Sequence, residues 1–191
     1  MRVTAILLAA GSSLRFGGPK LLAPWRGRPL YEHALEALTG APEIAETLLV
    51  AQPGFAAAPR PRCRFVANPD HAEGMGSSLR AGVRASGESD AYLIALADMP
   101  AITPALIAAL VACYRQAGRA IVLPVCRGRR GHPVMIGAAL REELLAVAGD
   151  VGAREIIRAH PGLVGTFETE DEAVLFDVDR PADLAAGEGG A

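Results

Sequence analysis

The sequence predicts an α/β fold in which helices cover both faces of a mostly parallel sheet. Short apolar runs alternate with segments of helical periodicity along the chain, the pattern of parallel strands joined by helices. The run from Ala91 to Ala97 is almost wholly apolar, as expected for a central strand buried on both faces. A first apolar run, Val3 to Ala9, leads directly into a loop of small residues. Ligands of such sheets bind at the carboxyl ends of the strands, so we expect the functional site there.

Length and composition narrow the class of protein. The chain has 191 residues, which suits one domain over residues 1–186 followed by a flexible tail over 187–191. A net charge of −2 argues against a nucleic-acid surface, and no apolar segment is long enough to cross a membrane. The three cysteines lie far apart without metal-site spacing, and unpaired thiols are typical of a reducing cytoplasm. We therefore expect a cytoplasmic protein without nucleic-acid or membrane partners.

The expected elements follow from periodicity and from start and stop signals. Strands are expected at 3–9, 47–51, 63–67, 91–97, 120–125, 133–136 and 175–178. Helices are expected at 29–38, after Gly74–Ser78, from Pro104, at 138–146, at 151–160, and as a terminal turn from Pro181. Thr103 is expected to cap the helix that begins at Pro104.

The loop after the first strand has the residue types of a phosphate-binding loop. Ala10, Gly11, Ser12 and Ser13 can turn their backbone N–H groups toward a ligand, and two cations, Arg15 and Lys20, follow them. Phosphate oxygens are bound by convergent amide donors together with a guanidinium and an ammonium group. The spacing matches neither the P-loop nor the G-x-G-x-x-G motif. The alternative is a plain glycine turn, and the two cations favour phosphate.

Acidic residues at strand ends are candidate metal ligands. Asp98 directly follows the buried strand, where a carboxylate can hold Mg²⁺ against phosphate oxygens; a turn aspartate is the alternative. Asp177 and Asp179 are two residues apart on an expected strand end, so they should point to opposite faces. Only one of them can then easily share an ion with Asp98, and the other could cap the turn before Pro181.

Two further segments could bind ligands. In Gly74–Leu79, Ser78 could hydrogen-bond a base or ribose, whereas Ser77 could simply belong to a helix N-terminus. A basic loop contains Arg127, Arg129, Arg130 and His132, which would be solvated or would bind a phosphate-bearing partner. Asp150 is placed to cap the expected helix from Val151, and a ligand contact is the other interpretation.

Six motifs recur in this order in one known family. They are LAAGSSLRFGGPK at 8–20, GMGSSL at 74–79, ADMP at 97–100, GRRGHP at 128–133, GDVGAR at 149–154 and DVDRPADL at 177–184. With them the chain resembles the MobA-like nucleotidyltransferases, and its LAAG form is similar to the molybdenum cofactor cytidylyltransferase branch. The resemblance covers nearly the whole chain. It implies a Rossmann-like nucleotidyltransferase fold with three α/β/α layers.

The resemblance also implies a reaction and roles for particular residues. CMP would pass from CTP to the terminal phosphate of the molybdenum-pterin cofactor with release of pyrophosphate, and Mg²⁺ would be the metal cofactor. Such a nucleophile is already ionised at neutral pH, so no general base is required. The implied catalytic residues are Arg15, Lys20 and Asp98. The implied nucleotide-binding residues are Leu8, Ala9, Ala10, Gly11, Ser12, Ser13, Arg15, Lys20, Gly74, Ser78 and Asp98. The implied acceptor-binding residues are Arg129, Arg130, His132 and Asp150, and the implied metal ligands are Asp98, Asp177 and Asp179.

Alternatives remain open at this point. A relative could use GTP or another phosphorylated acceptor; Ala10, where the GTP-using branch has a second glycine, and Pro19 before Lys20 favour CTP. A different class is a cofactor-delivery chaperone, whose partner would be an apo-molybdoenzyme or its accessory protein. The presence of both Lys20 and Asp98 favours turnover over delivery alone.

Overall fold

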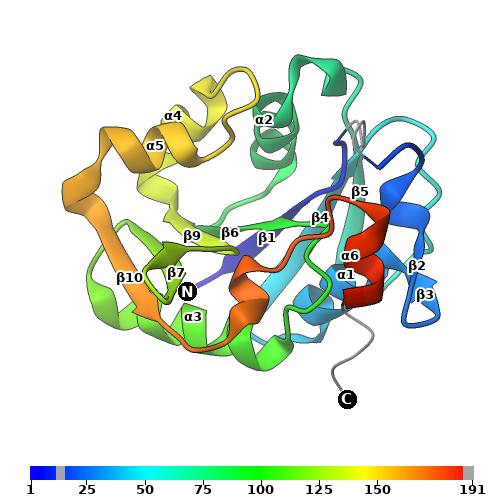
Figure 1. The fold of residues 1–191 in the computed structure, drawn as a ribbon. Coiled ribbons are helices and arrows are strands. Elements are labelled where there is room, and N and C mark those ends of the chain that lie inside the picture. The colour runs from blue at the N-terminus through cyan, green and yellow to red at the C-terminus, as the bar shows by residue number, and fades with distance from the viewer. Residues whose placement is uncertain (12–15, 187–191) are drawn as a thin grey trace.

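The protein is described by a computed structural model over residues 1–11 and 16–186 (Figure 1). The strands are β1 (Val3–Leu8), β2 (Pro24–Trp25), β3 (Arg28–Pro29), β4 (Ile44–Ala51), β5 (Cys63–Ala67), β6 (Ala91–Leu96), β7 (Ile121–Cys126), β8 (Arg129–Arg130), β9 (Val134–Gly137) and β10 (Val164–Glu168). The α-helices are α1 (Leu30–Gly40), α2 (Met75–Ala85), α3 (Pro104–Ala117), α4 (Arg141–Ala146), α5 (Arg154–Ala159) and α6 (Pro181–Ala186). Single 3₁₀ turns include η1 (Lys20–Leu22), η3 (Ala138–Leu140) and η5 (Glu172–Leu175).

The central sheet is mostly parallel, as expected. Its strands lie in the order β10-β7-β9-β6-β1-β4-β5, and β8 pairs with β7. The register of β1 against β6 runs from Val3↔Ala91 to Leu8↔Leu96 without a shift, so these two strands end together. Strand β9 is antiparallel to both of its neighbours, β6 and β7. The carboxyl ends of the parallel strands therefore form one edge of the sheet.

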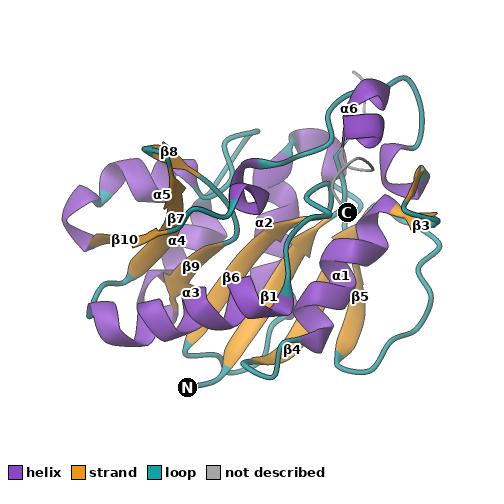
Figure 2. Cartoon of the chain, turned by 60° about the horizontal axis from the view of Figure 1, so that its bottom comes forward, coloured by secondary structure: helices purple, strands orange, loops and turns teal. Residues whose placement is uncertain are grey.

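Helices cover both faces of this sheet and enclose two cores. Alternate residues of β1 point to opposite faces: Leu7 packs in the core beneath α1 and α3, and Ile6 in the core beneath α2, α4 and α5. Figure 1 shows the two helix layers, and Figure 2 shows α1 and α3 lying along one face of the strands. Both cores are built from apolar residues that the sequence alternates along the strands. The predicted three-layer α/β/α fold is confirmed.

Most predicted elements are confirmed, with boundaries shifted by a few residues. The cap is present as expected, because Thr103 Oγ1 accepts from the Leu106 N–H at 3.2 Å. The helix expected at 138–146 is divided into η3 and α4, and the helix expected at 151–160 begins only at Arg154. No helix within the described ranges is both long enough and apolar enough to span a bilayer.

The strand predicted at 175–178 is wrong. Residues 172–175 form the turn η5, and the chain continues as an irregular segment with single backbone bonds to its neighbours. The edge position beside β7 is taken instead by β10, which pairs in parallel from Val164↔Ile121 to Glu168↔Val125. Val174 and Val178 are buried although they do not belong to a strand. Their side chains pack in the core and hold residues 174–178 on the rest of the protein.

Candidate functional site

Asp98 lies at the carboxyl edge of the sheet, where the sequence predicts it. Beyond the last residues of β1 and β6, the Ala97 N–H still donates to the Leu8 carbonyl at 3.1 Å. Asp98 follows at once, and its own carbonyl accepts from the Val178 N–H at 2.9 Å. The backbone of Asp98 is therefore held in two ways: by the end of the β1–β6 pairing and by a hydrogen bond from Val178.

Lys20 brings its ammonium group to this carboxylate. Its Nζ lies 2.8 Å from Asp98 Oδ2 and 3.4 Å from Asp179 Oδ1. The residue is only 8% exposed, which is rare for a lysine without a paired charge. Three of the residues predicted for catalysis or metal binding therefore meet at one point, although they are far apart in the sequence.

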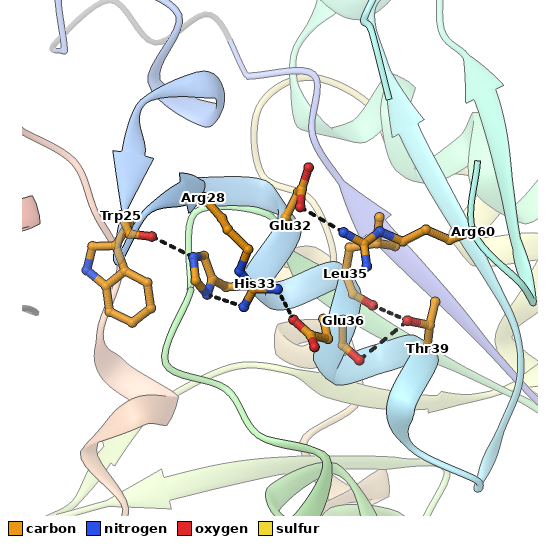
Figure 3. A network of polar contacts seen from close by, with 8 residues as sticks. All are labelled: Trp25, Arg28, Glu32, His33, Leu35, Glu36, Thr39 and Arg60. Carbon is orange, nitrogen blue, oxygen red and sulfur yellow. Dashed lines mark hydrogen bonds and ion pairs between the residues drawn. The ribbon is translucent and has the colours of Figure 1, made fainter. Parts of the chain in front are cut away.

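A small hairpin supports the segment that carries Lys20. Strands β2 and β3 pair directly after η1, and Trp25 is 3% exposed. Figure 3 shows Trp25, Arg28, His33 and Glu36 in one network of polar contacts. His33, on α1, contacts the Trp25 carbonyl through Nε2 at 2.7 Å and the Trp25 ring edge-on at 4.6 Å between centroids. Arg28 pairs with Glu36 of the same helix. These contacts hold the hairpin on α1.

Asp177 and Asp179 are delivered by the irregular segment that crosses the strand ends. Its anchors Val174 and Val178 are 1% and 0% exposed. Asp179 contacts Lys20, whereas Asp177 lines a neighbouring cleft. The two carboxylates therefore face different surroundings, although the segment is not a strand. Asp183 Oδ2 accepts from the backbone N–H groups of Asp179 and Arg180, which joins this segment to the first turn of α6.

The carboxylates fit a metal ion that arrives with phosphate. Asp98 Oδ1 is buried and has no hydrogen-bond partner among the residues that the structure describes, so one acceptor oxygen next to the Lys20 contact is open to a ligand. Burial, followed by the charges of Asp98 and Asp179, raises the pKa of Asp177. Among the described residues no three such groups form a ready-made metal cluster. Mg²⁺ typically takes one or two carboxylates and completes its shell with phosphate oxygens and water, so Asp98 suits that role.

A cleft of about 420 Å³ adjoins this cluster. Leu96, Met99 and Asp177 line the side next to Asp98, and four arginines, Arg129, Arg130, Arg154 and Arg158, line the cleft as well. Within the described part of the chain, none of the four guanidinium groups has a carboxylate partner, in contrast to Arg28, Arg60 and Arg127. Unpaired guanidinium groups around one cleft favour an anionic ligand.

The arginines reach the cleft from two elements. Arg129 and Arg130 form β8, which turns back on β7 through Arg127 and Gly128, both with positive φ (50° and 73°). This is the backbone of a two-residue hairpin whose twist suits paired strands. Arg127 does not line the cleft and pairs with Glu172. Arg154 and Arg158 lie four residues apart, on one face of α5.

His132 lines the cleft as predicted, in a constrained position. A Cβ on the preceding Gly131 would lie 2.2 Å from the Val174 carbonyl oxygen, so only glycine fits there. The His132 N–H donates to that same carbonyl at 2.9 Å. Burial, and then the positive charge of Arg154, lower the pKa of His132 to about 4. The imidazole is therefore neutral at neutral pH.

The structure corrects the expectation for Asp150 and adds two residues. The helix that Asp150 was expected to cap begins at Arg154, and Asp150 Oδ1 instead accepts from the Met75 N–H at 3.1 Å. The side chain of Asp150 is not among those that line the cleft. The sequence reasoning missed Arg154 and Arg158; the motif GDVGAR ends at Arg154 and contained the signal for the first of them.

The structure describes most of the predicted nucleotide-binding residues. Ser78 is 3% exposed and its Oγ accepts from Asn68 Nδ2 at 3.0 Å; Ser77 bonds to the same amide. Gly74 precedes α2, and the first amides of that helix already have partners inside the protein. Leu8 and Ala9 are buried, whereas Ala10 and Gly11 are more open. Ser12, Ser13 and Arg15 lie outside the described residues.

Comparisons with known proteins agree with this architecture. Residues 5–164 match the MobA-like NTP transferase domain. The nicotine blue oxidoreductase of Paenarthrobacter nicotinovorans is 39% identical over 188 residues, covering 93% of this chain and 92% of that protein. The probable molybdenum cofactor guanylyltransferase of Deinococcus radiodurans is 31% identical, covering 96% of this chain and 92% of that protein. The molybdenum cofactor cytidylyltransferase of Escherichia coli K12 is 22% identical, covering 95% and 93%.

Among solved structures, Rv0371c of Mycobacterium tuberculosis superposes with a TM-score of 0.85 at 23% identity, and the match covers 99% of both chains. A manganese complex of the same protein gives a TM-score of 0.79 at 21% identity, covering 100% of both chains. At these identities the superpositions show a common fold.

Proposed function

Because the chain belongs to the MobA-like NTP transferase family, we propose that it transfers CMP from CTP to the terminal phosphate of the molybdenum-pterin cofactor and releases pyrophosphate. One observation carries the proposal. The cluster of Lys20, Asp98 and Asp179 directly adjoins a cleft lined by four unpaired arginines. A triphosphate with its metal and an anionic acceptor need two such neighbouring sites.

The chemistry asks these residues for alignment and charge neutralisation. A phosphate monoester is ionised at neutral pH, so no side chain has to remove a proton. The arginines of the cleft would orient this phosphate toward the α-phosphorus, and Lys20 would offset charge on the triphosphate and the developing pyrophosphate. His132, being neutral, adds no cation to the cleft wall but can donate or accept one hydrogen bond.

Metal binding belongs to the same proposal. Bound together with the triphosphate, Mg²⁺ would neutralise phosphate charge and polarise the reacting phosphoryl group. Asp98 would hold it through Oδ1, which has no hydrogen-bond partner among residues 1–11 and 16–186, with Asp177 or Asp179 as the second carboxylate. Lys20 now pairs with Asp98 and Asp179, so its ammonium would have to turn toward phosphate as the complex forms.

We propose CTP as the nucleotide, on the strength of Ala10 and Pro19 in the first loop. Relatives named for cytidylyl and for guanylyl transfer are both similar over nearly the whole chain, so direct competition of the two nucleotides is required. A site that hydrogen-bonds its base rejects the wrong base because buried polar groups are left unpaired. The expected preference for CTP in kcat/KM is at least ~100-fold.

The decisive experiment mixes the protein with Mg²⁺, purified molybdenum-pterin cofactor and each of the four nucleoside triphosphates, and measures pyrophosphate. Release that depends on both CTP and cofactor supports the proposal. A preference for GTP would place the protein with the guanylyltransferases, and tight nucleotide binding without release would favour a delivery role. Since one relative is named nicotine blue oxidoreductase, a parallel assay with the dye nicotine blue and an electron donor is needed. Reduction of that dye without any pyrophosphate release would overturn the proposal.

A further inference from the structure

Helix α2 begins without a cap of its own. The residue before it is Gly74, which has no side chain and a φ of 101°. The hydrogen-bond acceptors for the first N–H groups of α2 come from a segment about 75 residues later in the chain. The Met75 N–H donates to Asp150 Oδ1 at 3.1 Å, and the Gly76 N–H donates to the Gly149 carbonyl at 2.8 Å. A carboxylate at this end also interacts favourably with the helix dipole.

The two segments fit together with no room for a side chain between them. A Cβ on Gly74 would lie 2.9 Å from the Gly149 carbonyl group, and a Cβ on Gly76 would lie 2.8 Å from the Gly149 oxygen. From the other side, a Cβ on Gly152 would lie 2.8 Å from Met75 Sδ. Arg80 Nη1, on α2, also donates a hydrogen bond of 2.5 Å to the Val147 carbonyl of the other segment. The start of α2 and residues 147–152 therefore behave as one packed unit.

This unit connects the two proposed substrate sites. On one side α2 carries Ser77 and Ser78, which bond to Asn68. On the other side the segment after Asp150 contributes Val151, Ala153 and Arg154 to the wall of the cleft. Asp150 itself contacts the helix and does not line the cleft.

We propose that Asp150 is a positioning residue that fixes the nucleotide-side segment 74–78 against the acceptor-side loop 147–154, and that it does not bind the acceptor. The inference rests on the proposed function for the identity of the two sites. In this role the Asp150 carboxylate does not contact the acceptor substrate. It accepts a hydrogen bond from the backbone at the start of α2. Since asparagine caps helices as well as aspartate does, the two roles differ in what Asp150→Asn retains.

The kinetic test compares Asp150→Ala and Asp150→Asn with the wild type. The matched control is Glu155→Ala, which removes an exposed acid on α5 whose side chain has no bond within the described residues. We expect Asp150→Ala to raise the KM for CTP about tenfold, because a displaced α2 misplaces the nucleotide segment. Asp150→Asn should restore the KM to within about twofold of the wild type. An increase confined to the acceptor KM, equal in both Asp150 variants, would overturn the proposal.

A second measurement does not depend on turnover. Hydrogen exchange of the peptide that covers Met75 to Ser78 should accelerate in Asp150→Ala and stay near the wild-type rate in Asp150→Asn and Glu155→Ala. Unchanged exchange in Asp150→Ala would refute the cap. If exchange responds as expected but no nucleotide and acceptor give pyrophosphate, the positioning role stands and the proposed reaction fails.

Discussion

At the scale of single residues, the site depends on a lysine ammonium that is shared between carboxylates. Lys20 Nζ contacts both Asp98 Oδ2 and Asp179 Oδ1, and the second oxygen of Asp98 is buried without a partner in the described part of the chain. The Lys20 ammonium balances the charge of the two carboxylates while no ligand is bound, and Asp98 Oδ1 is still left to bind a cation. Removing either partner of a buried pair leaves the other uncompensated, so the two single variants should behave in opposite ways toward metal ions.

Replacing Lys20 by Met tests this arrangement. We expect pyrophosphate release to fall by at least ~100-fold, because charge on the triphosphate is no longer offset. At the same time, Mn²⁺ titrated without nucleotide should bind at least ~10-fold more tightly than to the wild type, since the carboxylates lose their internal cation. Calorimetry measures this affinity. Asp98→Asn is the control and should bind Mn²⁺ more weakly than the wild type; tighter binding there would contradict the assignment.

The two C-terminal carboxylates can be separated by the same approach. Asp179 contacts Lys20, whereas Asp177 faces the cleft and has a raised pKa. If one of them completes the metal site with Asp98, Asp177→Asn and Asp179→Asn should differ by at least ~10-fold in kcat at limiting Mg²⁺. Steady-state rates across a Mg²⁺ series provide the comparison. Two equally mild variants would show that neither carboxylate is a ligand.

At the scale of elements, the cleft is assembled by a hairpin, a short helix and residues 172–180, which comprise η5 and the irregular segment after it. Strand β8 supplies Arg129 and Arg130, and α5 supplies Arg154 and Arg158. Neither element is long enough to be stable alone, so both depend on the sheet beneath them. The geometry of the cleft is therefore a property of packing and not of either segment by itself.

The arginines of α5 should determine acceptor affinity. The double variant Arg154→Ala/Arg158→Ala removes two cations from the cleft, and we expect the acceptor KM to rise at least ~10-fold while the KM for CTP changes less than about twofold. Arg127→Ala is a matched control because Arg127 is in the same basic loop but pairs with Glu172. Pyrophosphate release at varied acceptor concentration measures the effect. A rise in the CTP KM alone would assign α5 to the nucleotide instead.

The contact between Gly131 and Val174 should be intolerant of a methyl group. An added Cβ would lie 2.2 Å from the Val174 carbonyl oxygen, so Gly131→Ala must displace the segment that carries Asp177 and Asp179. We expect the free energy of unfolding to fall by about 1–3 kcal/mol, as in other overpacked sites. Gly162→Ala is the control, because a Cβ there meets nothing within 4 Å. Urea denaturation distinguishes the two; equal stability would mean that the segment yields without cost.

At the scale of the whole molecule, the free energy of unfolding should depend on pH through His132, a half-buried histidine. The pKa of His132 is lowered to about 4, against an ordinary value near 6.5 that applies to the unfolded chain. Between these values the unfolded state binds a proton that the native state does not. The contribution is therefore fully present above about pH 6.5 and is lost as the pH falls toward 4.

Comparison with His132→Gln isolates this contribution. Between pH 7 and pH 4.5 the wild type should lose about 2–3 kcal/mol more of its free energy of unfolding than the variant. The raised pKa of Asp177 works in the opposite direction in both proteins, so the difference between them reports mainly on His132. Urea denaturation at several pH values provides the measurement. Parallel losses would show that His132 is protonated equally in the native and unfolded states.

The sequence alone determined the layers and the location of the site. Apolar alternation in β1 and the fully apolar run of β6 require a sheet buried on both faces, and the residues that follow these strands must then meet at one edge. Asp98, Lys20, Arg129, Arg130 and His132 were predicted in this way, from local pattern or from motifs, and they do lie around that edge. Such features depend on neighbouring residues in the chain, which the sequence displays directly.

Only the tertiary structure decided which residues serve as partners. Asp150 caps a helix 75 residues away instead of its own, Val174 and Val178 anchor an irregular segment instead of a strand, and Arg154 and Arg158 face the cleft from a helix that starts late. In each case the local pattern is compatible with more than one structure. The choice between them is made by contacts between distant segments, such as a glycine carbonyl that leaves no room for a side chain, and no local window of the sequence contains that information.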